Sequence, residues 1–372
     1  MRSLLEIMAE SARQHASDIF ITVGVPPVLK IEGQLKRMAG EPLRPDETAY
    51  MAAELSVKRD ELIQQGNAGE RDFSVSLPDI GRFRANVFLQ RGSVAISIRR
   101  IYSELPSPED LRIPPAVLSL AERTKGLVLV TGPAGSGKTT TLATLIDLIN
   151  HHRDCHVLTL EDPIEYLHRH GRSIINQREI GGDTRSYAEG LRAALRESPD
   201  VILIGEMRDL ETISIALTAA ETGHLVLSTL HTVGTAMTID RIVDVFPSNQ
   251  QQQVRIQLST VLQAVVSQQL LLASNGKRMA AFEVMLVNPA IRNMIRESKT
   301  PQIDSVLQMN SATGMRTMDM SLAELVNEGL VHLDDASPYC ISPETFLRMV
   351  RPEKRTNPDE GVGKARRSRP GG

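Results

Sequence analysis

The stretch Gly132-Pro-Ala-Gly-Ser-Gly137-Lys138-Thr139 has the G-x-x-x-x-G-K-T spacing of a phosphate-binding loop. It follows the apolar run 127–130 and precedes a segment of helical character at 140–150, so strand, loop and helix come in the order that the motif requires. In such loops the glycines let backbone N–H groups turn inward around phosphate oxygens, and the helix points its N-terminus at the anion. The stretch therefore predicts that the chain binds a nucleoside triphosphate.

Separate roles are expected for the residues of this loop. Lys138 is expected to reach the β- and γ-phosphates, and the Thr139 hydroxyl is expected to ligate Mg²⁺. The predicted nucleotide-binding residues are Gly132, Pro133, Ala134, Gly135, Ser136, Gly137, Lys138, Thr139 and Thr140. A glycine-rich turn without a ligand is the alternative interpretation, but such a turn does not require the Lys-Thr pair.

The composition bounds the class of protein. At 372 residues the chain exceeds what one hydrophobic core usually serves, so we expect two domains. Its 42 basic and 45 acidic residues give a net charge of −3, which provides no global electrostatic footprint for nucleic acid. The chain has no Trp and few other aromatic residues, so platforms for stacking single strands are scarce. We therefore expect no nucleic-acid partner.

Cysteine usage and the N-terminal segment indicate the compartment. Cys155 and Cys340 are too few for a disulfide framework or for a four-cysteine zinc site, which fits a reducing compartment. Glu6 and Glu10 interrupt the apolar N-terminal segment, unlike a signal peptide, and no apolar run approaches membrane-spanning length. We expect a soluble, cytoplasmic protein.

The first hundred residues read as a small α+β domain. A helical pattern at 4–12 is followed by alternating apolar segments at 19–23, 73–77, 83–88 and 94–98, which predict an antiparallel sheet rich in arginine. The predicted organisation is a domain at 1–101, a proline-rich linker at 102–115, a larger domain at 116–350 and a disordered tail at 351–372.

In the larger domain, apolar strands alternate with helical patterns. The strands are expected at 127–130, 157–160, 201–204 and 225–230, and the helices near 140–150, 185–197 and 211–221. Such alternation predicts an α/β fold, with a parallel sheet covered by helices. After about residue 250 the pattern reads as helical, with candidate helices at 249–271, 289–297 and 318–328.

Two carboxylates follow predicted strands of this domain. Glu206 ends the run Pro199-Asp-Val-Ile-Leu-Ile-Gly-Glu206, which is typical of a Walker B acid, and Glu161 ends the strand at 157–160. Ligands of open α/β sheets bind at the carboxyl ends of the strands, so both acids should lie beside the phosphate loop. We expect Glu206 to hold Mg²⁺, directly or through water, and Glu161 to act as the general base that activates water.

A fourth strand is bracketed by His224 and His231. His231 stands at its carboxyl end, where it could sense the γ-phosphate or orient water, and His224 stands at the opposite end. A single histidine is more often a structural residue. The convergence of four strand ends on one edge favours a functional role for His231.

The chain resembles the type IV pilus retraction ATPases, the PilT family of the secretion ATPase superfamily. The shared signatures are the phosphate loop, the Asp box Thr159-Leu-Glu-Asp-Pro-Ile-Glu165, the segment Gly205-Glu-Met-Arg-Asp209 and the His box ending Leu230-His231-Thr232. The resemblance extends from Ala16-Ser-Asp18 to Met315-Arg-Thr-Met-Asp319. It implies a RecA-like P-loop ATPase core with a smaller PAS-like N-terminal domain.

The resemblance also implies roles for particular residues. It implies Glu161 as the catalytic glutamate, Glu206 as the Walker B acid and His231 as a coupling residue. Six chains form a ring in the family, and arginines of the N-terminal sheet approach the nucleotide there. The matching arginines are Arg82, Arg84 and Arg99, for which a solvated basic sheet face is the alternative.

One further match bears on the direction of pilus movement. Ala290-Ile-Arg-Asn-Met-Ile-Arg-Glu297 is close to a family segment on which retraction depends, although an ordinary packed helix explains the same pattern. The extra N-terminal domain and the four-cysteine motif of the extension and type II secretion ATPases are not found in the sequence. Both observations favour retraction over assembly.

The implied function is a hexameric, ATP-hydrolysing motor that needs Mg²⁺ and retracts type IV pili for twitching motility. The implied partners are an inner-membrane platform protein and, indirectly, pilin, with a paralogous retraction ATPase as a further candidate. The implied location is the cytoplasmic face of the inner membrane. Four alternatives stay open: an accessory retraction ATPase of the PilU type, a pilus-assembly or secretion ATPase, a non-catalytic nucleotide switch, and a nucleic-acid translocase.

Overall fold

The computed structural model describes residues 2–31, 33–55, 70–77, 80–101 and 105–354. The chain divides into two compact units, Met1–Leu105 with Pro163–His168, and Pro106–Asp162 with Arg169–Gly372. Residues 102–104 of the predicted linker and 355–372 of the predicted tail lie outside the described residues. None of the described helices has both the length and the apolar character that crossing a bilayer requires.

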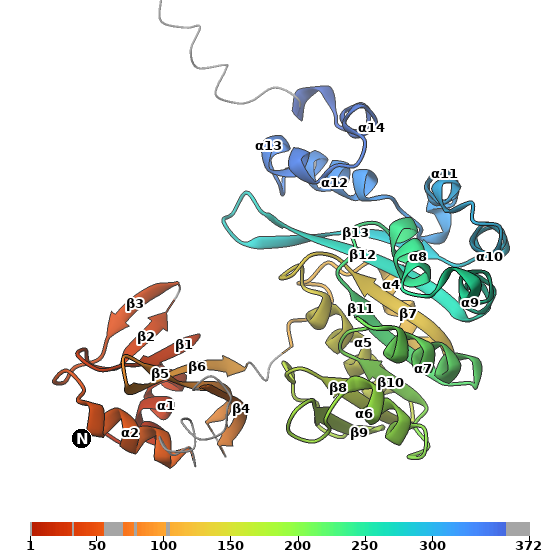
Figure 1. The fold of residues 1–372 in the computed structure, drawn as a ribbon. Coiled ribbons are helices and arrows are strands. Elements are labelled where there is room, and N and C mark those ends of the chain that lie inside the picture. The colour runs from red at the N-terminus through yellow and green to blue at the C-terminus, as the bar shows by residue number, and fades with distance from the viewer. Residues whose placement is uncertain (1, 32, 56–69, 78–79, 102–104, 355–372) are drawn as a thin grey trace, which may run out of the picture. The chain divides into compact units, whose positions relative to one another are not determined.

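The N-terminal unit is built on an antiparallel sheet, as predicted (Figure 1). Its order in the described residues is β3-β2-β1-β6-β5-β4, and neighbouring strands pair antiparallel throughout. The strands are β1 (Asp18–Ile21), β2 (Val28–Ile31), β3 (Gln34–Arg37), β4 (Glu70–Leu77), β5 (Gly81–Gln90) and β6 (Ser93–Ile101).

Two helices complete the core of this unit. Helix α1 (Leu4–Arg13) begins with a capping box, in which the Ser3 hydroxyl accepts from Glu6 N and the Glu6 carboxylate accepts from Ser3 N. Its buried residues lie at helical spacing and pack in one cluster with the sheet and with α2 (Pro45–Glu54). The sequence pattern predicted α1, whereas α2 and β3 were not expected.

The second unit carries a mixed, mostly parallel sheet in the order β13-β12-β7-β11-β10-β8-β9 (Figure 1). Only β13 runs antiparallel to its neighbour among these described strands. The strands are β7 (Gly126–Thr131), β8 (His156–Glu161), β9 (Ile174–Glu179), β10 (Val201–Ile204), β11 (Leu225–Leu230), β12 (Leu262–Leu272) and β13 (Arg278–Leu286). The predicted α/β class is confirmed.

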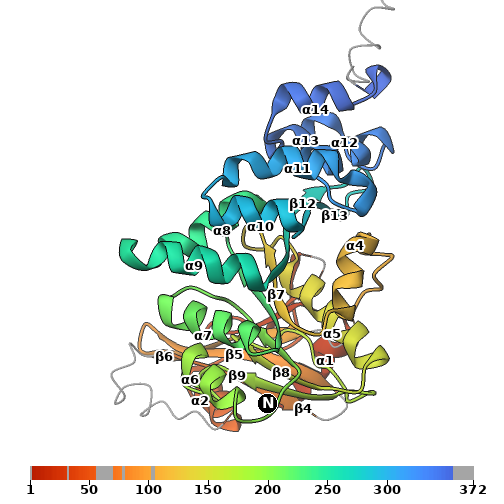
Figure 2. The same cartoon turned by 90° about the vertical axis from the view of Figure 1, so that its right-hand side faces the viewer.

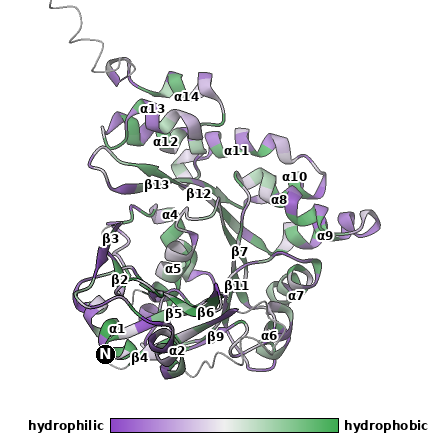
Figure 3. Cartoon of the chain, turned by 60° about the vertical axis from the view of Figure 1, so that its left-hand side comes forward, coloured by the Kyte–Doolittle hydropathy of each residue, from purple (hydrophilic) through white to green (hydrophobic). Residues whose placement is uncertain are grey.

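Helices cover both faces of this sheet, so its central strands are buried on both sides. Helices α4 (Pro115–Leu118) and α5 (Lys138–His152) pack on one face; the hydrophobic part of α5 is coloured green in Figure 3. The helices of the other face are α6 (Tyr187–Ala194), α7 (Leu210–Glu221), α8 (Thr235–Asp244), α9 (Ser248–Val261), α10 (Pro289–Arg296) and α11 (Ile303–Met309).

The C-terminal helices form a cluster of their own. Helices α12 (Met318–Asn327), α13 (Leu333–Ala336) and α14 (Pro343–Met349) share a separate core with the ends of β12 and β13 (Figure 2). This cluster is attached to the large sheet through the β12–β13 hairpin.

The prediction of one helix over 249–271 is wrong. Helix α9 ends at Val261, and the chain continues directly as β12 between β7 and β13. Most residues of this interior strand are buried, but its sequence mixes apolar residues with Gln263, Ser267, Gln268 and Gln269, so the run lacks the alternation that marks a half-buried strand. Such a run after a helix cannot be told from more helix by its periodicity.

Candidate active site

The phosphate loop joins the central strand β7 to helix α5. All six residues of β7 are buried, and β11 and β12 flank the strand in parallel. Gly137 precedes α5 with φ of 90°, a left-handed conformation that glycine adopts without strain. The loop therefore ends with the first N–H groups of a 15-residue helix, which carry no intrahelical partner.

Gly132 lies against strand β12. A Cβ atom at this position would stand 2.2 Å from the backbone carbonyl oxygen of Gln268, and φ of Gly132 is 137°. Gln268 also accepts a 2.8 Å hydrogen bond from the Thr141 hydroxyl through Oε1, which ties β12 to α5 beneath the loop. The loop conformation is thus fixed from below by buried contacts.

Replacing Gly132 by alanine should lower the free energy of unfolding by about 2–4 kcal/mol, because it adds backbone strain to a clash with backbone. The matched control is Gly135→Ala, since Gly135 has φ of 76° and nothing within 4 Å of its Cβ position. That change should cost about 1 kcal/mol, from left-handed backbone alone. Urea unfolding measures both values, and equal losses would contradict the packing argument.

The loop is closed on itself by its lysine. Lys138 is 8% exposed, and its Nζ donates to the carbonyl oxygens of Gly132 and Pro133, each at 2.9 Å. Ser136 is 2% exposed, and among the described residues its Oγ has no hydrogen-bond partner. A buried ammonium and a buried hydroxyl thus stand in the loop, and both can bind phosphate oxygens.

Of the other predicted nucleotide-binding residues, Pro133, Ala134 and Gly135 are exposed, whereas Thr139 and Thr140 are half-buried at the start of α5.

The parallel register brings the other candidates to the same edge of the sheet. Thr131, which precedes the loop, pairs with Leu230, which precedes His231. On the next strand, Ile204 pairs with Leu160, which precedes Glu161. The four predicted strands therefore end together, with their polar residues at one edge. His224 lies before β11 at the opposite edge, as predicted, where its Nδ1 contacts the Ala219 carbonyl at 2.9 Å.

Glu161 is the last residue of β8 and is 8% exposed. Its Oε1 accepts a 2.6 Å hydrogen bond from the Thr159 hydroxyl and a 3.1 Å bond from Gln177 Nε2. Thr159 lies two residues earlier on the same strand and Gln177 lies on the neighbouring β9, so both donors come from the rigid sheet. The orientation of this carboxylate is thereby fixed.

Glu206 is held between two basic side chains. Its Oε1 lies 2.6 Å from Arg208 Nε and 3.1 Å from His231 Nε2, and the Glu206 side chain is 16% exposed. Burial by itself raises the pKa of Glu206, but the hydrogen bond from Arg208 and the neighbouring His231 together lower it. The Glu206 carboxylate therefore stays ionised at a lower pH than an ordinary glutamate does.

The predicted arginines lie in the N-terminal unit. Arg82 and Arg84 lie on β5, and Arg84 pairs directly with Arg99 on β6. The Arg99 Nε donates to Asp18 Oδ1 at 2.9 Å, while its side chain remains 74% exposed. Arg84 and Arg99 also line a cavity of about 310 Å³ within this unit. Two of the three guanidinium groups thus lie side by side on one sheet.

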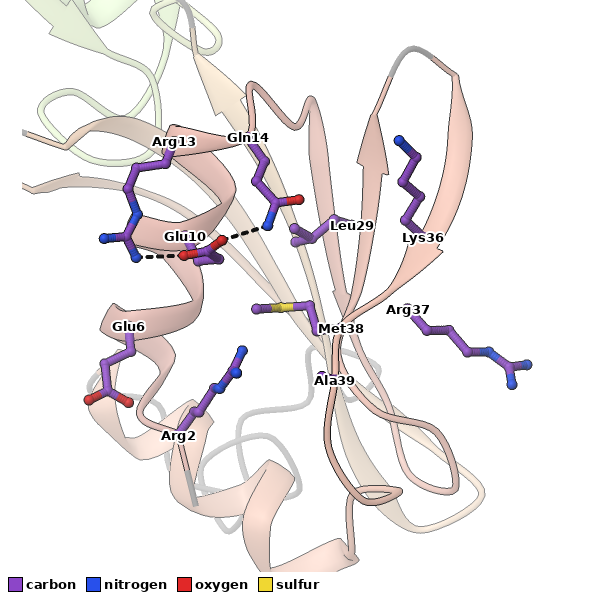
Figure 4. A pocket seen from close by; sticks show the side chains of 10 residues that line it. All are labelled: Arg2, Glu6, Glu10, Arg13, Gln14, Leu29, Lys36, Arg37, Met38 and Ala39. Atoms are coloured by element: carbon purple, nitrogen blue, oxygen red, sulfur yellow. Dashed lines mark hydrogen bonds and ion pairs between the residues drawn. The ribbon is translucent and has the colours of Figure 1, made fainter.

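A larger hollow of about 610 Å³ lies between α1 and strands β2 and β3 (Figure 4). Its floor includes Leu29 and Met38, and Glu10 on its rim accepts from Arg13 and Gln14, each at 2.5 Å. Four basic side chains, Arg2, Arg13, Lys36 and Arg37, and two acidic ones, Glu6 and Glu10, line this hollow.

Comparison with known proteins identifies the family. A family model described as type II/IV secretion system protein matches residues 1–277. The chain belongs to this family. The type IV pilus retraction ATPase PilT of Pseudomonas aeruginosa is 44% identical over 343 residues, which cover 92% of this chain and 99% of that protein. A crystal structure of the pilus retraction motor PilT with bound ADP is 47% identical, with a TM-score of 0.87, and covers 94% of this chain and 100% of that one.

Another relative of this secretion ATPase is more distant. The type IV pilus ATPase PilU of Pseudomonas aeruginosa is 37% identical over 350 residues, which cover 94% of this chain and 90% of that protein. The predicted resemblance to the PilT family and the predicted P-loop ATPase are both confirmed.

Two residues near the carboxylates of this secretion ATPase received no role from the sequence. Arg208 lies within the signature Gly205-Glu-Met-Arg-Asp209, but its pairing with Glu206 was not predicted. The Tyr187 hydroxyl would lie 2.8 Å from a Cβ at Gly205, and burial raises its pKa, helped by Asp162, Glu206 and Glu161. Its only signal in the sequence was its place directly after Ser186, which caps α6.

Proposed function

We propose that this chain is the ATP-hydrolysing motor that retracts type IV pili. The main observation in support is that the phosphate loop, Glu161, Glu206 and His231 lie together at one edge of the sheet. The chain also matches nearly the full length of a PilT retraction ATPase. A nucleotide switch that only binds would not need two fixed carboxylates beside the phosphate loop. The reaction is ATP and water giving ADP and phosphate.

Binding of ATP begins at the loop. Lys138 exchanges the carbonyl oxygens of Gly132 and Pro133 for the β- and γ-phosphates, which carry full negative charge. The N–H groups of residues 135–140 and the Ser136 hydroxyl surround the phosphate oxygens. The ammonium then stands where negative charge develops during hydrolysis.

Glu161 is the general base of the proposed mechanism. The Thr159 hydroxyl and Gln177 both donate to its Oε1 and hold the carboxylate at the end of β8. A carboxylate fixed in this way can orient the attacking water and take its proton. His231, in contact with Glu206, is placed to report whether a γ-phosphate is present.

Magnesium fits the donor set of this edge. Mg²⁺ prefers hard oxygen ligands, and the edge offers the half-buried Thr139 at the start of α5 and the Glu206 carboxylate, whose lowered pKa keeps it ionised. Thr139 and Glu206 would hold the ion, Glu206 directly or through water. When bound, the ion neutralises phosphate charge.

The proposed assembly is a homohexamer at the cytoplasmic face of the inner membrane. Arg82, Arg84 and Arg99 would come from the N-terminal unit of a neighbouring protomer and stabilise charge at the phosphate, so that hydrolysis moves that unit. An integral membrane platform protein of the pilus machine is the proposed partner, with pilin moved indirectly. A partner ATPase of the accessory class is a further candidate.

An accessory retraction ATPase is the second candidate function. The higher identity to PilT than to PilU, 44% against 37%, favours the principal motor. The segment 290–297 lies in α10, where Ile291 and Ile295 are buried and Arg292 donates to the Ser259 and Thr260 carbonyls at the end of α9. An anchored helix of this kind also serves ordinary packing, so the identity carries more weight.

Deletion of the gene in its source cell tests the proposal. A retraction motor predicts excess surface pili together with lost twitching, and expression of the wild-type chain should restore both. The control is complementation with Glu161→Gln, which should not restore twitching. Cells without pili would point to assembly, and unchanged pili and motility would contradict both pilus functions.

A further inference from the structure

Glu283 on β13 is a buried carboxylate that the proposed mechanism does not use. It is 1% exposed and forms no ion pair with any described residue. Its Oε1 accepts from the backbone N–H of Thr235 at 2.6 Å, and its Oε2 accepts from the backbone N–H of Met318 at 3.2 Å. The two oxygens of one side chain therefore join the first residues of two helices, α8 and α12.

A carboxylate suits this position because helix N-termini carry partial positive charge and N–H groups without intrahelical partners. Helix α8 follows Gly234 and has no side-chain cap of its own. Burial raises the pKa of Glu283, and the bonds from Thr235 and Met318 oppose that rise. A buried charge without a cation is costly, so two backbone donors are a specific arrangement.

Helix α8 begins four residues after His231, so the Glu283 contact fixes one end of the His231 loop. The other end is the β11 strand, whose Leu230 is paired in the sheet. Between them, Gly234 N donates to Ser267 Oγ at 3.0 Å. The imidazole that contacts Glu206 at 3.1 Å is thus carried by a short loop anchored at both ends.

The second oxygen of Glu283, Oε2, contacts helix α12 in the C-terminal helical cluster. Met318 is the first residue of α12, and α12 packs with α13 and α14 in the C-terminal cluster. A displacement of the His231 loop at Thr235 would therefore also disturb the hydrogen bond between Glu283 and Met318 at the start of α12.

We propose that Glu283 is a positioning residue, which holds the His231 loop in register with Glu206 and links it to α12. The inference rests on the proposed roles of Glu206 and His231. Because a displacement of about 1 Å at reacting groups can cost up to 10²-fold in rate, losing one anchor of this loop should slow hydrolysis.

A double-mutant cycle tests this role. Glu283→Gln keeps the size of the side chain but presents an NH₂ group to one of the two N–H donors, so one anchor is lost. We expect kcat for ATP to fall about ten-fold while KM changes less than about two-fold. In a His231→Ala background the same substitution should cause no further loss, because Glu283 acts through His231.

The matched control is Ser321→Ala. The Ser321 hydroxyl on α12 accepts from Phe282 N at 3.0 Å, so the change disturbs the same β13–α12 contact one residue from Glu283. It leaves both Glu283 contacts in place and should keep kcat. Equal losses in Ser321→Ala and Glu283→Gln, or additive losses with His231→Ala, would overturn the inference. A wild-type protein without ATPase activity would instead overturn the proposed function.

Hydrogen exchange of the wild-type chain gives a test that does not depend on a variant. Adding a non-hydrolysable ATP analogue should change the protection of the Thr235 and Met318 amides together, because one carboxylate holds both. A Met318 amide that does not respond to the analogue overturns the link to α12, even if Glu283→Gln fails to fold.

Discussion

Lys138→Ala should reduce ATP turnover by about 10³-fold, because it removes the cation placed where phosphate charge develops. The ammonium lies inside the loop, 2.9 Å from the carbonyl oxygens of Gly132 and Pro133, so the loop is arranged around this side chain before ATP binds. Steady-state phosphate release by purified protein measures the effect. Nucleotide affinity should fall as well, since the same group contacts the β- and γ-phosphates of the substrate.

Lys277→Ala is the control for this change. Lys277 is an exposed lysine of the β12–β13 turn, in the same unit, and its removal alters net charge by the same amount. Its turnover should match wild type within about two-fold, as expected for a surface change. If Lys138→Ala kept wild-type turnover while remaining folded by circular dichroism, the assignment of the phosphate site would be wrong.

Local sequence patterns predicted the elements that carry the proposed chemistry. Buried parallel strands have apolar runs that end sharply at polar residues, so Glu161, Glu206 and His231 were each found at a strand end. That these residues lie at the same edge of the sheet followed from topology, since parallel strands joined by right-handed crossovers end on the same side. The placement of these residues therefore depended on pattern and general topology alone.

Other features needed the folded chain. The β12 strand was predicted as helix because its sequence lacks the alternation of a half-buried strand, and its place beside β7 is set by pairs such as Ala264 with Val128, which are 136 residues apart in sequence (264 − 128). Glu283 lies on β13, where the sequence predicted no strand, so its contacts with the first residues of two helices were also missed. Arg208 could not be assigned because its partner depends on the turn after β10, where Met207 N donates to Thr229 O.

Glu161→Gln separates catalysis from binding. The amide keeps the shape of the side chain, and its oxygen can still accept from Thr159 and Gln177, but it cannot take a proton from water. We therefore expect kcat to fall by about 10²- to 10⁴-fold while ATP affinity stays close to wild type. This distinguishes Glu161→Gln from Lys138→Ala, in which affinity and turnover fall together.

Single-turnover hydrolysis and equilibrium binding of ATP measure the two quantities on the same protein. The control is Glu197→Gln, since Glu197 is an acid of the same unit that pairs with Arg178 at 3.1 Å on the surface. Exposed ion pairs contribute little, so that variant should retain turnover and stability. A Glu161→Gln protein that hydrolysed ATP at the wild-type rate would transfer the base role to another group, of which Asp162 is the adjacent carboxylate. A loss of ATP affinity without a loss of kcat would show that Glu161 binds the nucleotide rather than activating water.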